Sequence, residues 1–164
     1  MNKNVLKAVI AGSLVASLGM GATAAHAATA SATAKAKILR QVTLTNTTDL
    51  QFGTIVSSPT ASTVIVSTAG VRTCGTSLVC SGASTAAGFA VTGTSGQVVT
   101  VSVPATVTLS SGTNSMLSTL NASAATLTLA ANAGAFSVGG ILAVGADQAD
   151  GDYAGTFNVT ADYQ

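Results

Sequence analysis

An alternation of apolar and polar residues with a period of two runs through Tyr153-Ala154-Gly155-Thr156-Phe157-Asn158-Val159-Thr160-Ala161-Asp162-Tyr163. Successive side chains of a β-strand point to opposite faces, so this alternation predicts a strand with one apolar and one polar face. The bulky or apolar residues on the first of these faces are Tyr153, Phe157, Val159, Ala161 and Tyr163. We therefore expect a half-buried strand over residues 153–163.

Residues 28–38 alternate in the same way, with Ala or Ile at every even position and Thr, Ser or Lys at every odd position. The apolar face consists mainly of Ala, and Ala is a poor strand former by itself. The segment is therefore expected to need a partner strand in order to be ordered. The alternative is a disordered leader, since the first residues of a mature domain are often poorly ordered.

Short strand-like runs separated by turn residues fill the sequence between these two segments. The clearest runs are residues 42–44, 50–53, 63–67, 88–92, 97–103, 107–109, 125–130 and 136–144. Residues 93–96 are expected to form a hairpin turn, and residues 115–120 are the one candidate helical turn. About eight to ten short strands without a long helix predict an all-β fold, an antiparallel β-sandwich.

The first 27 residues have the features of a secretory signal peptide. Lys3 and Lys7 precede an apolar run over residues 8–20, and Ala25-His26-Ala27 is a small-x-small cleavage site. Removing 27 of the 164 residues leaves a mature chain of 137, which suits one domain. We expect a signal peptide at 1–27, an N-terminal extension at 28–39 and a β-sandwich domain at 40–164, with no membrane span in the mature chain.

The mature chain is nearly uncharged, and its few charges are unevenly placed. Its four cations all precede residue 73 and four of its five acids follow residue 146, for a net charge of −1. Soluble domains are about 25% charged, and a chain with so little charge tends to self-associate. The composition favours assembly, and it argues against a nucleic acid as partner because a phosphate backbone needs a basic surface.

Cys74 and Cys80 are the only cysteines, and in an exported chain they are expected to form a disulfide bond. A zinc site needs four ligands, and the mature chain has no His to complete one. The Gly-, Ser- and Thr-rich sequence around the two cysteines, residues 70–87, is expected to be an irregular loop that the disulfide stiffens.

The residue types that enzymes use for acid–base chemistry are scarce in the mature chain. The only His, His26, lies in the signal peptide, so a Ser-His-Asp or Cys-His arrangement cannot form. Asp147, Asp150 and Asp152 lie in or beside a Gln-Ala-Asp-Gly-Asp sequence that suits a polar turn, with a calcium site as the alternative. We expect no enzymatic activity, no catalytic residues, no cofactor and no metal site.

Five segments together carry a resemblance to a known family. They are residues 34–39, 50–53, 89–93, 136–140 and 151–160. The most specific pattern is Gly-x-Tyr-x-Gly-x-x-x-Val-Thr-x-x-Tyr, which begins at Gly151. The mature chain resembles a family of small secreted bacterial proteins with a domain of unknown function, and its layout is similar to that of fimbrial subunits exported by the chaperone–usher route.

This resemblance implies an immunoglobulin-like sandwich that lacks its last strand. Donor-strand exchange would complete it, with the N-terminal extension of the next subunit added as a β-strand. The donor residues implied are Ala30, Ala32, Ala34, Ala36 and Ile38. The implied edge of the open groove, which a periplasmic chaperone would cover first, is formed by Tyr153, Phe157, Val159, Ala161 and Tyr163.

The function implied is that of a structural pilus subunit. Identical subunits would form a head-to-tail polymer at the cell surface, a fimbrium with a role in cell adhesion, after export through the periplasm with a chaperone and an outer-membrane usher. The alternative is a self-complete secreted β-sandwich that acts as an adhesion or binding module. In that case residues 28–38 pair within their own chain and the protein is a monomer.

Overall fold

A computed structural model describes residues 27–164 and divides the chain into two units after residue 36. The predicted signal peptide, residues 1–27, lies outside the described residues except for Ala27. In the first unit, residues 27–36 contain no strand and every one of them is exposed. A strand at residues 28–38 is thus not formed within this single chain, and the need for a partner strand stays a prediction.

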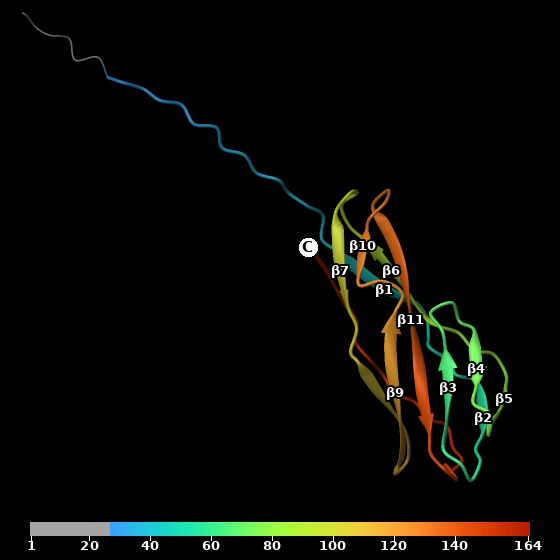
Figure 1. The fold of residues 1–164 in the computed structure, drawn as a ribbon. Coiled ribbons are helices and arrows are strands. Elements are labelled where there is room, and N and C mark those ends of the chain that lie inside the picture. The colour runs from blue at the N-terminus through green and yellow to red at the C-terminus, as the bar shows by residue number, and fades with distance from the viewer. Residues whose placement is uncertain (1–26) are drawn as a thin grey trace, which may run out of the picture. The chain divides into compact units, whose positions relative to one another are not determined.

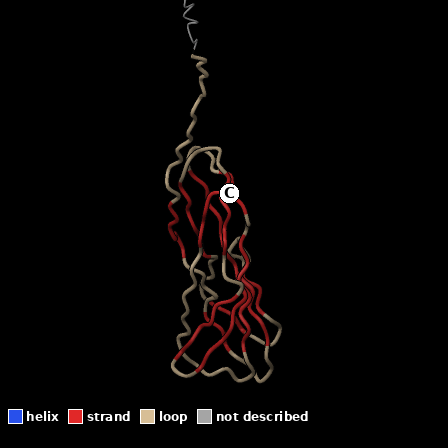
Figure 2. Tube along the Cα trace, turned by 90° about the vertical axis from the view of Figure 1, so that its left-hand side faces the viewer, coloured by secondary structure: helices blue, strands red, loops and turns tan. Residues whose placement is uncertain are grey.

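The second unit, residues 37–164, consists of strands and loops (Figures 1 and 2). Its strands are β1 Thr43–Thr48, β2 Thr54–Val56, β3 Ser62–Val66, β4 Arg72–Cys74, β5 Val79–Ser81, β6 Ala87–Thr92, β7 Val98–Ser102, β8 Thr106–Ser111, β9 Asn114–Ala122, β10 Thr126–Thr128, β11 Ala133–Val144 and β12 Thr160–Tyr163. All of their ladders are antiparallel. The predicted all-β, sandwich-like fold is confirmed. From residue 27 onward, no helix has the length and apolar character to cross a membrane.

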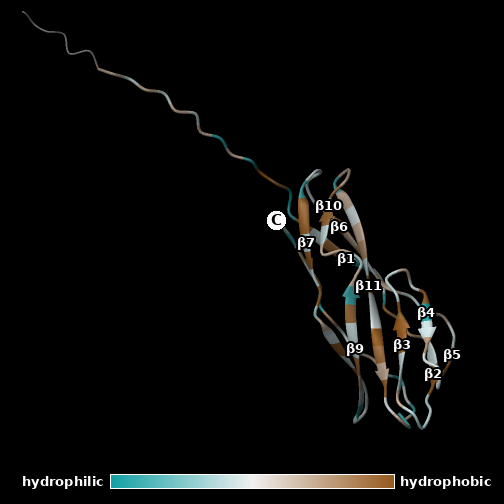
Figure 3. Cartoon of the chain, viewed as in Figure 1, coloured by the Kyte–Doolittle hydropathy of each residue, from teal (hydrophilic) through white to brown (hydrophobic). Residues whose placement is uncertain are grey.

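Two layers enclose the larger core at one end of this unit, where Figure 1 labels β7 and β10. One layer contains β1, β6 and β11, and the other contains β10, β7 and β12. Phe89 and Phe136 pack from the first layer with ring centroids 5.2 Å apart, and Val99 and Val101 pack from the second. Figure 3 shows the apolar character of β7.

A smaller core lies at the other end, beside β2 and β3, and contains Phe52, Val64 and Leu142. Here β11 continues past β6 and pairs with β3 and β9. The half-buried Leu50 packs against both cores, so the two ends form one continuous body.

The hairpin predicted at residues 93–96 is wrong, although a turn is present there. The N–H of Gln97 donates to the carbonyl of Thr94 at 3.3 Å, but β6 pairs with β1 and β11 whereas β7 pairs with β10 and β12. The two strands belong to opposite layers because the apolar faces of both cover the larger core. Turn residues predict the turn but not the layer that each strand joins.

The candidate helical turn at residues 115–120 is also wrong, because these residues lie in β9. Ser118 is buried, Met116 and Leu120 are half-buried, and the residues between them are exposed, as in a strand. Gly112 precedes them with φ of 57°, which suits a tight turn and which residues other than glycine rarely adopt. This turn brings β9 back along β8. The backbone N–H and carbonyl groups of residues 115–120 therefore pair with neighbouring strands and not with one another, as they would in a helix.

The predicted disulfide between Cys74 and Cys80 is confirmed. It joins β4, at the edge of the large sheet, to β5 of the separate β2–β5 sheet. The guanidinium of Arg72 supports the same connection, donating to the carbonyls of Phe52 at 3.0 Å and Ser81 at 2.8 Å. The region expected to be an irregular loop therefore contains two short strands held by covalent and polar contacts.

Replacing both Cys74 and Cys80 by Ala is expected to lower the free energy of unfolding by about 2–2.5 kcal/mol. A disulfide that closes a loop of about seven residues removes that much chain entropy from the unfolded state. Urea denaturation of the variant and its parent measures the difference. Equal midpoints would mean that the contacts of Arg72 hold the β2–β5 sheet without help from the disulfide.

Candidate functional site

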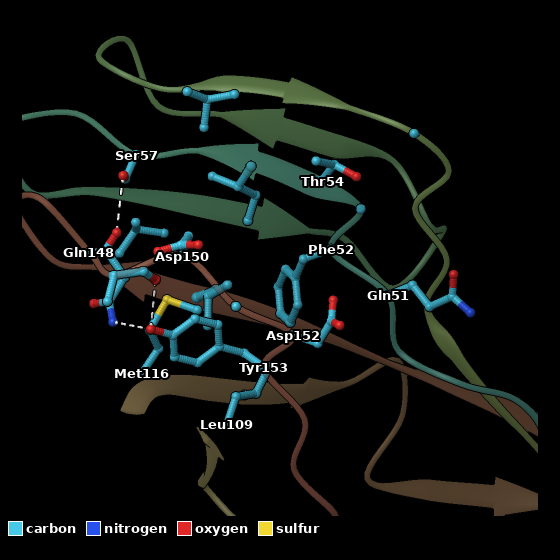
Figure 4. Close-up of a pocket in the computed structure, with 18 of the residues that line it drawn as sticks. Gln51, Phe52, Thr54, Ser57, Leu109, Met116, Gln148, Asp150, Asp152 and Tyr153 are labelled. Carbon is cyan, nitrogen blue, oxygen red and sulfur yellow. Dashed lines mark hydrogen bonds between the residues drawn. The ribbon is translucent and has the colours of Figure 1, made fainter. Parts of the chain in front are cut away.

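A groove with a volume of about 830 Å³ opens over the smaller core. Its apolar floor is formed by Phe52, Leu109, Met116, Leu142 and Val144. Figure 4 shows Phe52, Met116 and Tyr153 around this shared space. The floor is the outer surface of the smaller core, since each of these five side chains belongs to that core or packs against it.

The groove runs between two segments that are far apart in the sequence. One wall is formed by residues 50–57 and the other by residues 148–153. Within residues 37–164, β2 pairs only with β5, and Ala154, next to the second wall, bridges only to Ser110. The first wall therefore contains a strand whose ladder within residues 37–164 is to β5 alone, and the second wall is irregular backbone without a ladder.

Hydrogen bonds fasten the walls at one end of the groove. The hydroxyl of Ser57 donates to the carbonyl of Gln148 at 3.1 Å. The phenol of Tyr153 accepts from Nε2 of Gln148 at 2.8 Å and donates to the carbonyl of Ala149 at 2.8 Å (Figure 4). These contacts set the shape of the second wall and hold it against the first.

The predicted edge segment, residues 153–163, continues from this wall along the larger core. Its five predicted inward residues, Tyr153, Phe157, Val159, Ala161 and Tyr163, are all half-buried, and the polar residues between them are exposed. Phe157 meets Phe89 edge-on, with ring centroids 6.4 Å apart. The side chains therefore alternate as the sequence predicts.

The regular strand is shorter than predicted, because β12 covers only Thr160–Tyr163 and an isolated bridge joins Ala154 to Ser110. The segment between them lies opposite the link from β7 to β8, which contains Pro104. Proline has no N–H to donate to a ladder. The interruption is therefore a property of the neighbouring strand, and residues 153–163 alone do not reveal it.

Tyr163 joins the last strand to the chain that leads into β1. Its hydroxyl accepts from the N–H of Thr94 at 2.7 Å and donates to the carbonyl of Arg40 at 2.7 Å. β1 and β12 are in contact at this end. These contacts hold the end of β12 against the chain that leads into β1, whereas the groove lies beside Tyr153, at the other end of the segment.

Replacing Tyr163 by Phe is expected to lower the free energy of unfolding by about 1 kcal/mol, because two hydrogen bonds are lost at a partly exposed site. Thermal or urea denaturation of the variant measures this. Asp162→Asn is the control, since Asp162 is an exposed neighbour on the other face of β12. A loss equal to that of the control would contradict the role given to the phenol.

The predicted donor residues lie outside this site in the single chain. Ala30, Ala32, Ala34 and Ala36 are exposed in the first unit. Ile38, at the start of the second unit, is 92% exposed. The only described hydrogen bond from a side chain of residues 28–38 is that of Lys37 Nζ to Oε1 of Gln97, at 3.1 Å.

The sequence did not indicate the first wall or the floor of the groove. Leu109 and Met116 lie on different strands, and only the pairing of β8 with β9 places them opposite each other. Asp150 and Asp152, predicted to lie in a polar turn, are exposed and line the groove. Among residues 27–164, no three His, Cys, Asp or Glu side chains come close enough to hold a metal ion.

Residues 42–163 match the family model described as "Domain of unknown function (DUF4402)". This chain belongs to that family. The DUF4402 domain coincides with the folded body, from the residue before β1 to the last residue of β12, and leaves the alternating segment 28–38 outside it. No curated protein matches the chain.

Proposed function

We propose that this DUF4402 protein is the structural subunit of a surface pilus, in which the N-terminal extension of each copy is added as a β-strand to the next copy. The observation that carries the proposal is the groove. It combines an apolar floor with one wall that contains β2, whose ladder within residues 37–164 is to β5 alone, and a second wall of irregular backbone without a ladder. An added strand supplies both the apolar side chains and the backbone partners that such a site lacks.

The extension matches the predicted edge segment, residues 153–163, in length. Residues 28–38 and residues 153–163 are both segments of eleven residues with a period of two. An extended strand rises about 3.3 Å per residue, so each segment spans about 36 Å. The extension is thus long enough to run beside the whole edge segment.

Composition supports the same proposal. A mature chain with four cations and five acids carries little charge to keep copies apart. The signal-peptide pattern and the disulfide suit an exported protein. We place the polymer at the cell surface as a fimbrium. A periplasmic chaperone would cover the groove during export, and an outer-membrane usher would exchange it for the next subunit.

A synthetic peptide of residues 28–39 tests the proposal on the mature chain that lacks residues 28–36. We expect saturable binding of one peptide per chain and a higher melting temperature, because a ligand that binds only the folded state stabilises it. The control peptide carries Asp at position 34, which places a charge on the apolar face. If neither peptide binds and the intact mature chain is a monomer, the protein is instead a self-complete secreted adhesion or binding module.

A further inference from the structure

We infer that copies of this chain also pack side by side, through an uncharged face of the large sheet that meets the same face of a second copy. This outer face consists of the exposed side chains of five adjacent strands, which follow one another across the sheet in the order β8, β9, β11, β3 and β4. The inference rests on the proposed function, because polymers repeat the contact. It adds a surface that strand addition does not use.

The outer face lies on the opposite side of the sheet from the groove. Leu142 and Met116 line the groove, whereas their chain neighbours Ile141 and Leu117 are exposed. Successive side chains of a strand point to opposite sides of a sheet. A strand that is added in the groove therefore leaves the outer face free.

A row of side chains crosses the middle of the outer face. The strand registers place Thr73, Ile65, Ile141, Thr119 and Thr106 directly opposite one another on successive strands. Directly opposite residues lie on the same side of a sheet. The two isoleucines of this row are 38% and 44% exposed. Two bulky apolar side chains therefore protrude next to each other, and Ile141 lies on the central strand.

A hollow with a volume of about 480 Å³ lies beside this row. It is lined by Thr63, Leu117 and Ala143, each two residues away from the row along its strand, and by no charged side chain. The face thus combines protruding side chains with a space that can receive such side chains from another copy. An interface between identical faces needs this self-complementary shape.

None of the four cations and five acids of the mature chain, all of them described in the structure, lies on the outer face. Three cations precede β1, and Asp49 and the three acids after β11 lie outside all strands. Arg72 lies opposite the buried Val66 and therefore points inward. Asp162 lies on β12 in the other layer. Two copies can therefore bring their outer faces together without burying a charge.

This lack of charge favours a second copy as the occupant of the face. About a quarter of the residues of a typical soluble domain are charged, and burying a charge without a partner is costly. The surface of an unrelated protein would therefore lose more free energy on the outer face than another outer face would. In a polymer, every copy presents one.

The size of the outer face determines how strong the contact is. Five strands about 4.8 Å apart, each contributing about five residues, cover about 400 Å². Two such faces bury about 800 Å² in total, which is less than the about 1,200–2,000 Å² of stable complexes. One contact is too weak to hold two single copies, but two polymers that lie side by side repeat it many times. We therefore expect polymers of the mature chain to form bundles.

Two matched substitutions test the outer face in these polymers. Thr119→Asp places a carboxylate beside Ile141, and Thr126→Asp places one on β10 in the other layer; both threonines are exposed strand residues. Electron microscopy and low-speed sedimentation should show bundles for the parent and for Thr126→Asp, at about 1 M salt as well, because exposed charges are screened there. Thr119→Asp should weaken bundling at least about tenfold and leave single polymers.

A crosslinking experiment tests whether the outer face meets itself. Packed sheets lie about 10 Å apart, so a thiol crosslinker with about that reach should join two copies of Ile141→Cys. The product is a covalent dimer that survives strong heating in detergent. Thr126→Cys is the control and should give no dimer. Cys74 and Cys80 are bonded to each other and do not react.

The chain that lacks residues 28–36 tests the contact without polymers. A contact with a Kd near about 1 mM is expected for so small an interface. At millimolar concentration, the amide chemical shifts of β3, β9 and β11 should therefore change with protein concentration, and those of β7 and β12 should not. Thr119→Asp should abolish the change, and Thr126→Asp should preserve it.

Four results would overturn the inference and leave the proposed function standing. They are parent polymers that stay single, bundles that dissolve at high salt, bundles that Thr119→Asp leaves intact, and bundles in which Ile141→Cys gives no covalent dimer. A parent chain that forms no polymer would instead overturn the proposed function. The chemical shifts of the shortened chain would then decide the inference alone, and shifts that do not depend on concentration would overturn it.

Discussion

Deleting residues 28–36 is expected to convert the polymers of the mature chain into monomers. The deleted segment contains no residue of either core, since both cores lie within residues 42–163, so the body should remain folded. The deletion removes most of the strand that we propose to fill the groove of the next copy. Size-exclusion chromatography with light scattering and electron microscopy of the two proteins measure the change.

A pair of single substitutions separates the role of the apolar face from that of the segment as a whole. Ala34→Asp places a charge on the face that would meet the edge of the acceptor, and Thr33→Asp places the same charge on the opposite face. The first should prevent polymers as fully as the deletion does, because burying an unpaired carboxylate is costly. The second should leave them intact. Equal behaviour of the two variants, or polymers without residues 28–36, would exclude the extension as a donor strand.

Replacing Phe136 by Ala is expected to lower the free energy of unfolding by about 3–5 kcal/mol, the usual range for removing a buried aromatic ring. Phe136 lies in the middle of the larger core, 5% exposed and stacked on Phe89. The loss would be a large part of the total stability of a small domain, which is about 5–15 kcal/mol. Urea denaturation in the background lacking residues 28–36 measures it without interference from polymers.

Ile141→Ala is the matched control, because Ile141 lies on the same strand and is 44% exposed. We expect its effect to stay within about 1 kcal/mol, as for most partly exposed positions. Similar losses at Phe136 and Ile141 would contradict the position of the larger core.

The features that the sequence predicted well are local. The alternation from Tyr153 to Tyr163 reports which side chains face inward, and the structure places those side chains in half-buried positions. Cys74 and Cys80 are the only cysteines of a chain with a signal-peptide pattern, and this was enough to predict their bond. The absence of any long helical pattern was enough for the fold class.

The features that the sequence missed depend on residues far away. Met116, Leu117 and Leu120 are spaced like residues on a helix, and only the β8 and β11 strands on either side make them part of a strand. β6 and β7 join different layers because their apolar faces cover the larger core from opposite sides, and the sequence of neither strand reveals this. The first wall of the groove consists of residues 50–57, whose sequence is that of an ordinary strand, and its role arises only from its position opposite residues 148–153.

The central claim is that copies of the mature chain are joined by strand addition. The most direct measurement is the size of the protein secreted by its own cells, on a detergent gel with and without boiling. We expect a ladder of large species that collapses on strong heating to one band near the mass of the 137-residue chain left when 27 of the 164 residues are removed. A single monomer band without heating, with no filaments in the culture medium, would contradict it.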